Sequence, residues 1–192
     1  MIVYLYIFYI RVTNQLLKKM KKISILILVS LLASCQFDAP NATTDTQIGV
    51  EISDSGEKIS LNAGELSTVT VWEKYVKAHN DRDLETIKQM DSDTFKAYGP
   101  RGEFIDGPEA HIQFLRKWFN DNDPTWASNY FIANELTNDK GELRQWVTSG
   151  HDVTMTVDST TVKVAQIHDA LIKDGKVQMF YVYERVKQEN EE

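Results

Sequence analysis

Residues 161–186 read TVKVAQIHDALIKDGKVQMFYVYERV, and this stretch decides the fold class. Apolar side chains alternate with polar ones, and β-branched and aromatic residues are abundant, as in half-buried β-strands. The polar segment 173–176 (KDGK) interrupts this pattern, which predicts two strands, over 161–172 and 177–186, joined by a tight turn. A connection this short joins antiparallel neighbours.

The same two-residue period extends upstream as far as Pro124. It predicts two further strands, over 126–136 and 143–157. The short polar segments 138–141 and 158–160 separate these strands from their neighbours. Four consecutive strands with short turns predict an antiparallel meander.

Before Pro124 the apolar residues recur every three to four positions, as on one face of a helix. The pattern predicts a helix over 66–80, a short second helix capped by Asp83, and a third that starts at Pro108. A short strand pair, over 94–98 and 103–105, is predicted between the second and third helices. The expected fold class is α+β, with three N-terminal helices packed on a curved antiparallel sheet.

This order of elements resembles the nuclear transport factor 2-like (NTF2-like) superfamily, which includes SnoaL-like cyclases and ketosteroid isomerases. The resemblance rests on 75–84 (YVKAHNDRDL), 167–177 (IHDALIKDGKV) and 148–151 (TSGH), and it covers about 66–187. It implies a cone with a mostly apolar pocket at its wide mouth. It also implies a homodimer that forms through the sheet.

The N-terminal sequence predicts a secretory leader. From Met20, basic residues precede an apolar run over 23–32, which is too short to span a bilayer. The sequence LASC at 32–35 resembles the bacterial lipobox, in which the cysteine is acylated. We therefore expect translation to start at Met20 rather than Met1, and Cys35 to anchor a lipoprotein in membrane lipid of the bacterial cell envelope, facing the periplasm or the surface. The alternative is a buried cysteine behind an ordinary signal peptide.

The expected organisation has four parts. They are an extension and signal peptide (1–34), an acylated Cys35 with a flexible polar tether (35–64), an NTF2-like domain (65–187) and a charged tail (188–192). A weak strand over 48–52 is possible within the tether.

Composition excludes several functions. From Cys35 onward the chain carries 16 Lys and Arg against 28 Asp and Glu, so it lacks the clustered positive charge that nucleic acid requires. A single cysteine among 192 residues excludes an internal disulfide framework and a multi-cysteine metal centre. There is no glycine-rich phosphate loop and no serine nucleophile elbow, so no cofactor is expected.

Tyr75 is the first candidate catalytic residue. It matches the first-helix tyrosine that, in the steroid isomerases the chain resembles, donates a hydrogen bond to an oxyanion. The alternative is a core tyrosine on the apolar face of its helix. The isomerase base falls on 98–100, which has no carboxylate, and the second acidic donor falls on His168 or Asp169. Steroid isomerase activity is therefore not expected.

His151 and His168 form the second candidate catalytic group, because they lie on consecutive predicted strands. If the turn pairs residues whose numbers add up to 319, the two imidazoles face each other and can act as acid and base. A register one residue away places them on opposite faces, and Gly150 could mark a bulge that decides between the two. Alternatively, one histidine is exposed and the other is satisfied within the sheet. Two histidines without a clear third ligand do not indicate a metal site.

Aromatic residues are the candidate ligand-binding groups, although a small cone also needs aromatics simply to fill itself. The candidates are Trp72, Trp118, Trp146 and Tyr98. His79 and His111 lie on helix stripes and are expected to be satisfied at the edge of the core. Strand alternation places Asp152 and Asp169 on the face opposite the neighbouring histidines.

Three functions remain open at this point. The preferred one is an envelope-anchored binding module that holds a small apolar or amphipathic ligand, or a partner protein, in the cone. The alternative is a cofactor-independent isomerase, dehydratase or hydrolase that uses His168 and His151 with Tyr75. The third is a structural dimer whose cone is filled by its own side chains.

Overall fold

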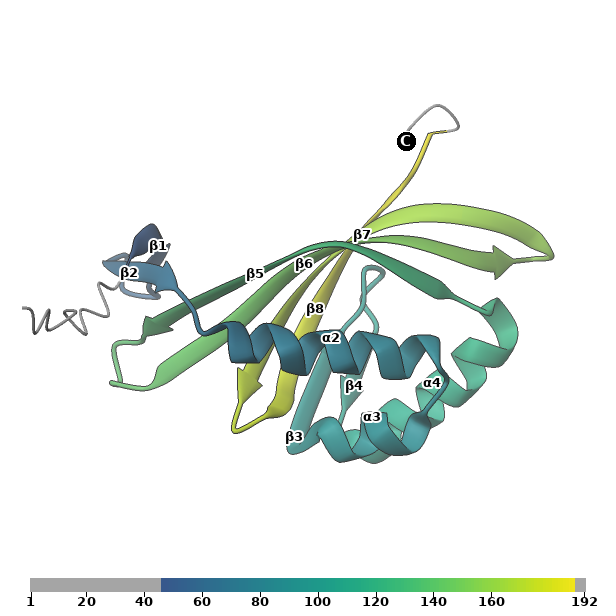
Figure 1. Cartoon of the computed structure of the whole chain (residues 1–192), viewed down its shortest axis with the longest axis horizontal. Coiled ribbons are helices and arrows are strands. Elements are labelled where there is room, and N and C mark those ends of the chain that lie inside the picture. The colour runs from purple at the N-terminus through teal and green to yellow at the C-terminus, as the bar shows by residue number, and fades with distance from the viewer. Residues whose placement is uncertain (1–45, 189–192) are drawn as a thin grey trace, which may run out of the picture. The chain divides into compact units, whose positions relative to one another are not determined.

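The computed structural model describes residues 46–188 (Figure 1). The predicted signal peptide, the predicted acylation site at Cys35 and nearly all of the predicted tail lie outside the described residues. The elements are β1 (Gln47–Ile52), β2 (Lys58–Ala63), α2 (Leu66–Asn80), α3 (Leu84–Met90), β3 (Asp91–Tyr98), β4 (Phe104–Asp106), α4 (Pro108–Asn122), β5 (Thr125–Thr137), β6 (Leu143–Val157), β7 (Thr160–Lys173) and β8 (Lys176–Val186).

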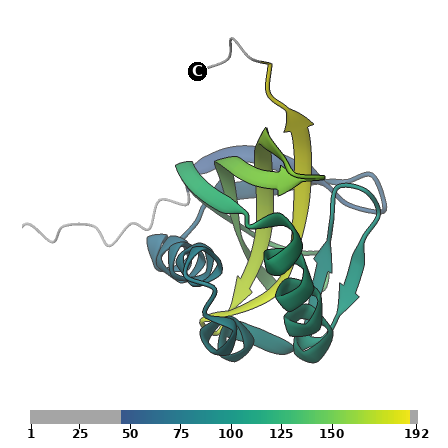
Figure 2. The same ribbon diagram turned by 90° about the vertical axis from the view of Figure 1, so that its right-hand side faces the viewer.

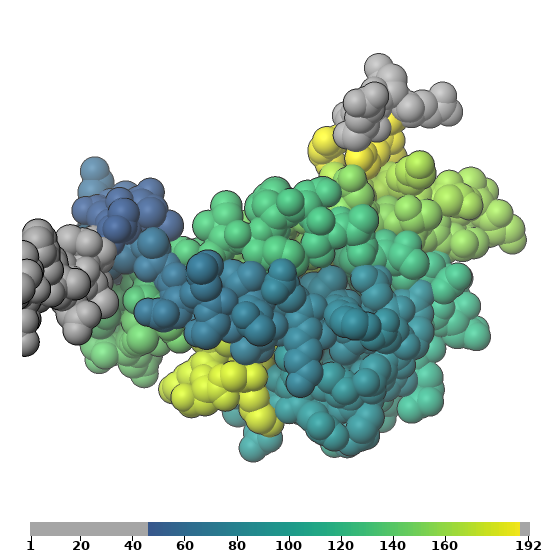
Figure 3. Space-filling view, viewed as in Figure 1, coloured from purple at the N-terminus to yellow at the C-terminus, as the bar shows by residue number. Residues whose placement is uncertain are grey.

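The strands form one curved sheet in the order β1-β2-β5-β6-β7-β8-β3-β4. All neighbouring pairs are antiparallel except β3 and β8, which run parallel, so the sheet is mixed rather than wholly antiparallel as predicted. The three helices pack on one face of this sheet (Figures 1 and 2). In the space-filling view, the side chains of α2 cover the front of the domain beside those of β5 (Figure 3).

The core lies between the helices and the inner face of the sheet. In β6 the odd-numbered residues from Val147 to Met155 are buried, and in β7 the even-numbered residues from Val164 to Ile172 are buried. This is the two-residue alternation of a sheet with one covered face. The helices contribute Trp72, Tyr75, Ile87 and Leu115 to the same core. The predicted α+β class and the three helices are confirmed.

The predicted tether over 35–64 is wrong in its second half. Residues 47–63 form the β1–β2 hairpin, and β2 pairs with β5 through Asn62 and Glu135. The strand considered over 48–52 is confirmed as most of β1. The alternation of apolar and polar residues in this hairpin is short and lies among polar residues, which is why the composition suggested a linker.

The β6–β7 register differs from the one considered above. Val157 pairs with Thr160, so Asp158 and Ser159 form a two-residue turn in which both have positive φ (47° and 63°). That conformation is the one favoured in two-residue hairpins because its twist matches that of the strands. Paired residue numbers therefore add up to 317 rather than 319, a shift of two positions, so His151 faces Gln166 and His168 faces Ser149.

A shift of two positions keeps both histidines on the inner face, as diagonal neighbours rather than direct partners. Their ring centroids are 4.5 Å apart. Gly150 does lie at a bulge, but the bulge is in β5, between Ser128 and Tyr130. A Cβ on Gly150 would come within 2.3 Å of the Tyr130 ring, so the glycine makes room for that ring.

Candidate functional site

A partly open cavity of about 180 Å³ lies between the helices and the inner face of the sheet. Engineered apolar cavities of about 150 Å³ bind benzene, so this space suits a molecule with one ring. The lining comes from both layers of the domain. Its main contributors are Trp72, Tyr75, His79, Ile105, His111, Leu115, Trp118, Trp126, Gln166, His168, Phe180, Val182 and Glu184.

A buried carboxylate lies beside the cavity. Asp91, the first residue of β3, accepts a hydrogen bond from the Tyr75 hydroxyl (2.6 Å) and one from Nδ1–H of His111 (2.9 Å). Tyr75 lies on α2 and His111 on α4, so one side chain joins three elements. A buried charge is tolerated only when it is hydrogen-bonded in this way.

Tyr75 is therefore not arranged as the sequence suggested. Burial, followed by the charge of Asp91 and the hydrogen bond to it, raises the pKa of Tyr75 well above its ordinary value. The hydroxyl keeps its proton, and that proton points at Asp91. Tyr75 lines the cavity but has no free proton to donate to a ligand carbonyl.

His168 also lines the cavity, and its tautomer follows from its neighbours. Two hydrogen bonds fix the orientation of the Gln166 side-chain amide. Its Nε2 donates to the Glu184 carboxylate (2.8 Å), and its Oε1 accepts from Nε1–H of Trp126 (3.1 Å). Since Oε1 can only accept, the ring nitrogen 2.9 Å from it, Nε2 of His168, carries a hydrogen. Nδ1 of His168 is then an acceptor, and it is buried with no hydrogen-bond partner among the described residues.

His151 occupies a different environment from His168. Ser149 Oγ accepts from Nε1–H of Trp72 (2.8 Å) and can donate to Nε2 of His151 (2.8 Å), while Nδ1–H of His151 can donate to Ser128 Oγ (3.0 Å). Both ring nitrogens are thus occupied, and His151 does not line the cavity. The structure brings the two predicted histidines together, but it gives His151 a supporting position.

Burial keeps His79, His151 and His168 uncharged at neutral pH. It lowers the pKa of His79 to about 3, with a further contribution from His111, and the pKa of His151 to about 4. The pKa of His168 is also held well below its ordinary value, by burial first and then by the neighbouring His151 and His79.

The four predicted ligand-binding aromatics divide between the two faces of the sheet. Trp72 and Trp118 line the cavity. Trp146 and Tyr98 do not: both stack on Tyr181 on the outer face, with ring centroids 6.3 Å and 4.8 Å away. For these two residues the predicted placement in the pocket is wrong. Strand alternation is the reason, because Trp146 and His151 differ by an odd number of positions and point to opposite faces.

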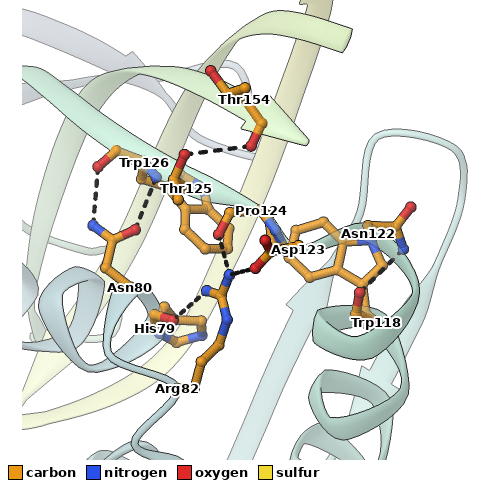
Figure 4. A network of polar contacts seen from close by, with 10 residues as sticks. All are labelled: His79, Asn80, Arg82, Trp118, Asn122, Asp123, Pro124, Thr125, Trp126 and Thr154. Atoms are coloured by element: carbon orange, nitrogen blue, oxygen red, sulfur yellow. Dashed lines mark hydrogen bonds and ion pairs between the residues drawn. The ribbon is translucent and has the colours of Figure 1, made fainter. Parts of the chain in front are cut away.

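A polar network holds part of the cavity wall in place (Figure 4). Arg82, which has a positive φ of 60°, donates to the His79 carbonyl (2.9 Å), to Asp123 (2.8 Å) and to the Pro124 carbonyl (2.6 Å). The Asn80 side chain both donates to and accepts from the Trp126 backbone. These bonds tie the end of α2 to the start of β5.

Sequence reasoning missed Asp91, Gln166 and Glu184, and it assigned His111 only to the core edge. Asp91 begins the polar run DSDT (91–94) between a short helix and a strand, so its local sequence carries no signal of burial. Gln166 does lie two positions from His168, and strand alternation places both on one face. That spacing was the one available signal.

The described residues hold neither a metal-binding cluster nor a membrane-spanning helix. Residues 46–188 contain no cluster of three or more His, Cys, Asp or Glu side chains placed to hold a metal ion. Within the same range, no helix has the length and apolar character needed to cross a membrane.

No protein-family model matches this sequence, and no curated protein sequence matches it. Solved structures do match. An LEH-like epoxide hydrolase from M. tuberculosis has a TM-score of 0.52 at 13% identity, over 62% of this chain and 83% of that one. A putative ketosteroid isomerase from Kribbella flavida has a TM-score of 0.51 at 14% identity, over 68% and 86%.

An NTF2-like protein from Burkholderia pseudomallei also matches, with a TM-score of 0.50 at 15% identity, over 63% of this chain and 91% of that one. Likenesses at such low identity concern the fold. The domain has the NTF2-like fold, and the resemblance read from the sequence is confirmed at that level.

The depressed histidine pKa values predict that acid destabilises the domain. An unfolded histidine titrates near 6.5, so below that pH the unfolded chain binds protons that folded His79, His151 and His168 do not take up. The free energy of unfolding should therefore fall as the pH is lowered from 6.5 towards 4, by up to about 1.4 kcal/mol per pH unit for each histidine. Urea unfolding between pH 7 and 5 measures this slope.

His168→Gln should remove about one proton from that pH dependence. A stability that stays flat between pH 7 and 5 would contradict the burial of uncharged imidazoles.

Proposed function

We propose that this domain binds a small, largely apolar molecule in its cavity. The proposal rests on one observation: side chains of the domain leave the inner cavity unfilled. The wall of this cavity is rich in aromatic rings. One wall residue, His168, has a buried ring nitrogen, Nδ1, without a hydrogen-bond partner in residues 46–188. Concave apolar sites with a few polar groups are the usual form of small-molecule sites. A purely structural cone would be closed by packing.

The walls indicate how such a molecule would be held. Trp72 and Phe180 present rings from α2 and β8, with centroids 5.6 Å apart. Trp118 and Trp126 present rings from α4 and β5, with centroids 5.5 Å apart. A planar or alicyclic ring held between these two pairs of side chains would lose its hydration shell and gain contact on several sides.

Truncating one wall should weaken binding. In Trp118→Ala the affinity for any retained compound should fall at least about tenfold, which corresponds to about 1.4 kcal/mol. Trp146→Ala is the matched control, since it removes the same side chain from the outer face of the sheet. Native mass spectrometry of each protein after exposure to a bacterial lipid and metabolite extract measures the retained mass. A clean ligand-free spectrum for the wild type across extracts would contradict the proposal.

A second candidate function, acid–base catalysis, is favoured by the contact between His111 and Asp91. A carboxylate on Nδ1–H fixes the ring so that Nε2 can take a proton, and it stabilises the imidazolium that results. His111 lines the cavity, as does His168, whose Nδ1 is a second possible base. The catalytic set proposed from the sequence changes accordingly: His151 and Tyr75 support the site, and His111 and His168 are the candidate bases.

Catalysis would be visible as a new product mass when the extract is incubated with the protein. His111→Asn should reduce such turnover by roughly 10²- to 10⁴-fold, because the amide can still donate to Asp91 but cannot accept a proton from the substrate. Binding should stay within a few-fold of wild type. Unchanged turnover in this variant would remove His111 from the mechanism.

Anchoring and assembly are also proposals. Acylation of Cys35 in the cell envelope is supported by the lipobox-like sequence at 32–35, and the mass of the mature N-terminal peptide would show or exclude the lipid.

A homodimer through the sheet is supported by exposed apolar residues on its outer face, including Ile167 and Tyr183. Analytical ultracentrifugation with Tyr183→Glu would test that dimer.

A further inference from the structure

Seven side chains that line the cavity can donate a hydrogen from a ring nitrogen or a phenol oxygen, and six of them donate it to another atom of the protein. The six pairs are Trp72 to Ser149, Trp126 to Gln166, Tyr75 to Asp91, His79 to the Tyr75 carbonyl, His111 to Asp91 and His168 to Gln166. The seventh is the indole N–H of Trp118, which has no acceptor among residues 46–188.

The nitrogen of Trp118 is unpaired, but it is not enclosed by protein. In the described part of the chain, the fully buried side-chain atoms without a partner are Ser92 Oγ and His168 Nδ1, and Trp118 Nε1 is not among them. The residue is half-buried, with its ring 5.5 Å from that of Trp126 and 6.2 Å from that of Phe114 between centroids. Because Trp118 lines the cavity, its N–H is available to a bound molecule, which the enclosed Nδ1 of His168 is not.

Arg101 and Asn122 also bring N–H groups to the lining. The Arg101 guanidinium pairs with Glu184 at 3.0 Å and its side chain is 72% exposed, so water competes for its remaining hydrogens. Nδ2 of Asn122 gives one hydrogen to the Trp118 carbonyl at 3.1 Å, which holds this amide on the same part of α4 as the indole (Figure 4). Of these three residues, Trp118 has the donor with neither a partner in the protein nor a neighbouring counter-charge.

The charge of the lining narrows the choice of acceptor. Its Asp, Glu, Lys and Arg side chains are Arg101, Glu103 and Glu184, so negative charge exceeds positive. The buried carboxylate of Asp91, beside the cavity, adds to that excess. A ligand carboxylate would be repelled by these groups and would lose its hydration against aromatic walls. A neutral carbonyl oxygen accepts a hydrogen bond without that repulsion.

We infer that Trp118 recognises the polar group of the ligand: its indole N–H donates to a neutral carbonyl oxygen while the ligand's ring packs against the aromatic walls. This inference rests on the proposed binding function and specifies one contact of that site. It places the acceptor of the ligand at α4 rather than at Tyr75, whose proton is already given to Asp91.

Cyclohexanone and methylenecyclohexane test the inference, because they have nearly the same shape and only the ketone has an oxygen that can accept. Each is titrated into the purified full-length ¹⁵N-labelled protein, and the indole N–H signals of the four tryptophans are followed, assigned with variants that replace each by phenylalanine. Neither probe is aromatic, so neither moves these signals by a ring current. The Trp118 indole proton should move downfield as cyclohexanone saturates the site, and methylenecyclohexane should leave it near its ligand-free position.

Trp146 provides the control within the same spectrum. Its indole N–H also lacks a partner in the described range, but its ring stacks on Tyr181 on the outer face of the sheet. Its signal should move with neither probe. A Trp118 signal that responds equally to both probes, or that stays in place although cyclohexanone binds, would overturn the inference while leaving the binding function intact.

The variant Trp118→Phe measures the same contact as an affinity. It removes the N–H and part of the ring, and the lost ring contact weakens both probes, so the ratio of the two losses isolates the hydrogen bond. Cyclohexanone should weaken about fivefold more than methylenecyclohexane. Trp146→Phe should change neither affinity. Equal losses in Trp118→Phe would overturn the inference, and if that variant does not fold, the wild-type indole shifts decide alone.

The two proposals can fail separately. If wild-type protein binds neither probe up to its solubility limit, while the extract still yields a retained mass that Trp118→Ala loses, the inferred carbonyl contact is wrong and the cavity remains a binding site. If neither experiment detects binding, the proposed function and this inference fall together.

Discussion

The rest of the domain depends on the buried carboxylate of Asp91. It sits at the start of β3 and accepts hydrogen bonds from Tyr75 on α2 and His111 on α4, so the two long helices are joined to the sheet through one charge. Such a charge would be strongly destabilising without its donors, and the donors would be unsatisfied without it. The Lys176 ammonium, which donates to the Asp91 carbonyl at 3.1 Å, joins the start of β8 to the same point.

That constraint also fixes the hydrogens of two residues that line the cavity. Because Tyr75 and His111 direct their hydrogens to Asp91, neither of those hydrogens is offered to a ligand. On the opposite wall, Glu184 accepts a hydrogen bond from the Gln166 side chain, and Gln166 in turn accepts the Nε2 hydrogen of His168. That hydrogen is therefore not offered to a ligand either. The second network leaves Nδ1 of His168 as a buried acceptor that has no hydrogen-bond partner within residues 46–188. A satisfied polar network of this kind is rigid, and rigidity preserves the position of the unpaired nitrogen.

The elements of the fold were predictable because each has a clear period. Apolar spacing alone predicts the helix over 66–80, the helix that starts at Pro108 and the four long strands. Register was not predictable, because the polar segment 158–160 does not reveal which of its residues form the turn. The position of Trp146 on the outer face could be predicted, because an odd number of positions separates it from His151. The position of Tyr98 could not, because it depends on how β3 pairs with β8. Asp91 was not predictable, since its role arises from two residues 16 and 20 positions away in sequence.

The most direct test of this account is the protonation state of the His168 ring at pH 7. A long-range ¹H–¹⁵N spectrum of the labelled protein distinguishes a protonated ring nitrogen from an unprotonated one. The account predicts a neutral ring with its hydrogen on Nε2 and an unprotonated Nδ1, because Gln166 is oriented by Glu184 and Trp126. A hydrogen on Nδ1, or a doubly protonated ring, would contradict the claim that the oriented Gln166 amide fixes the tautomer of His168.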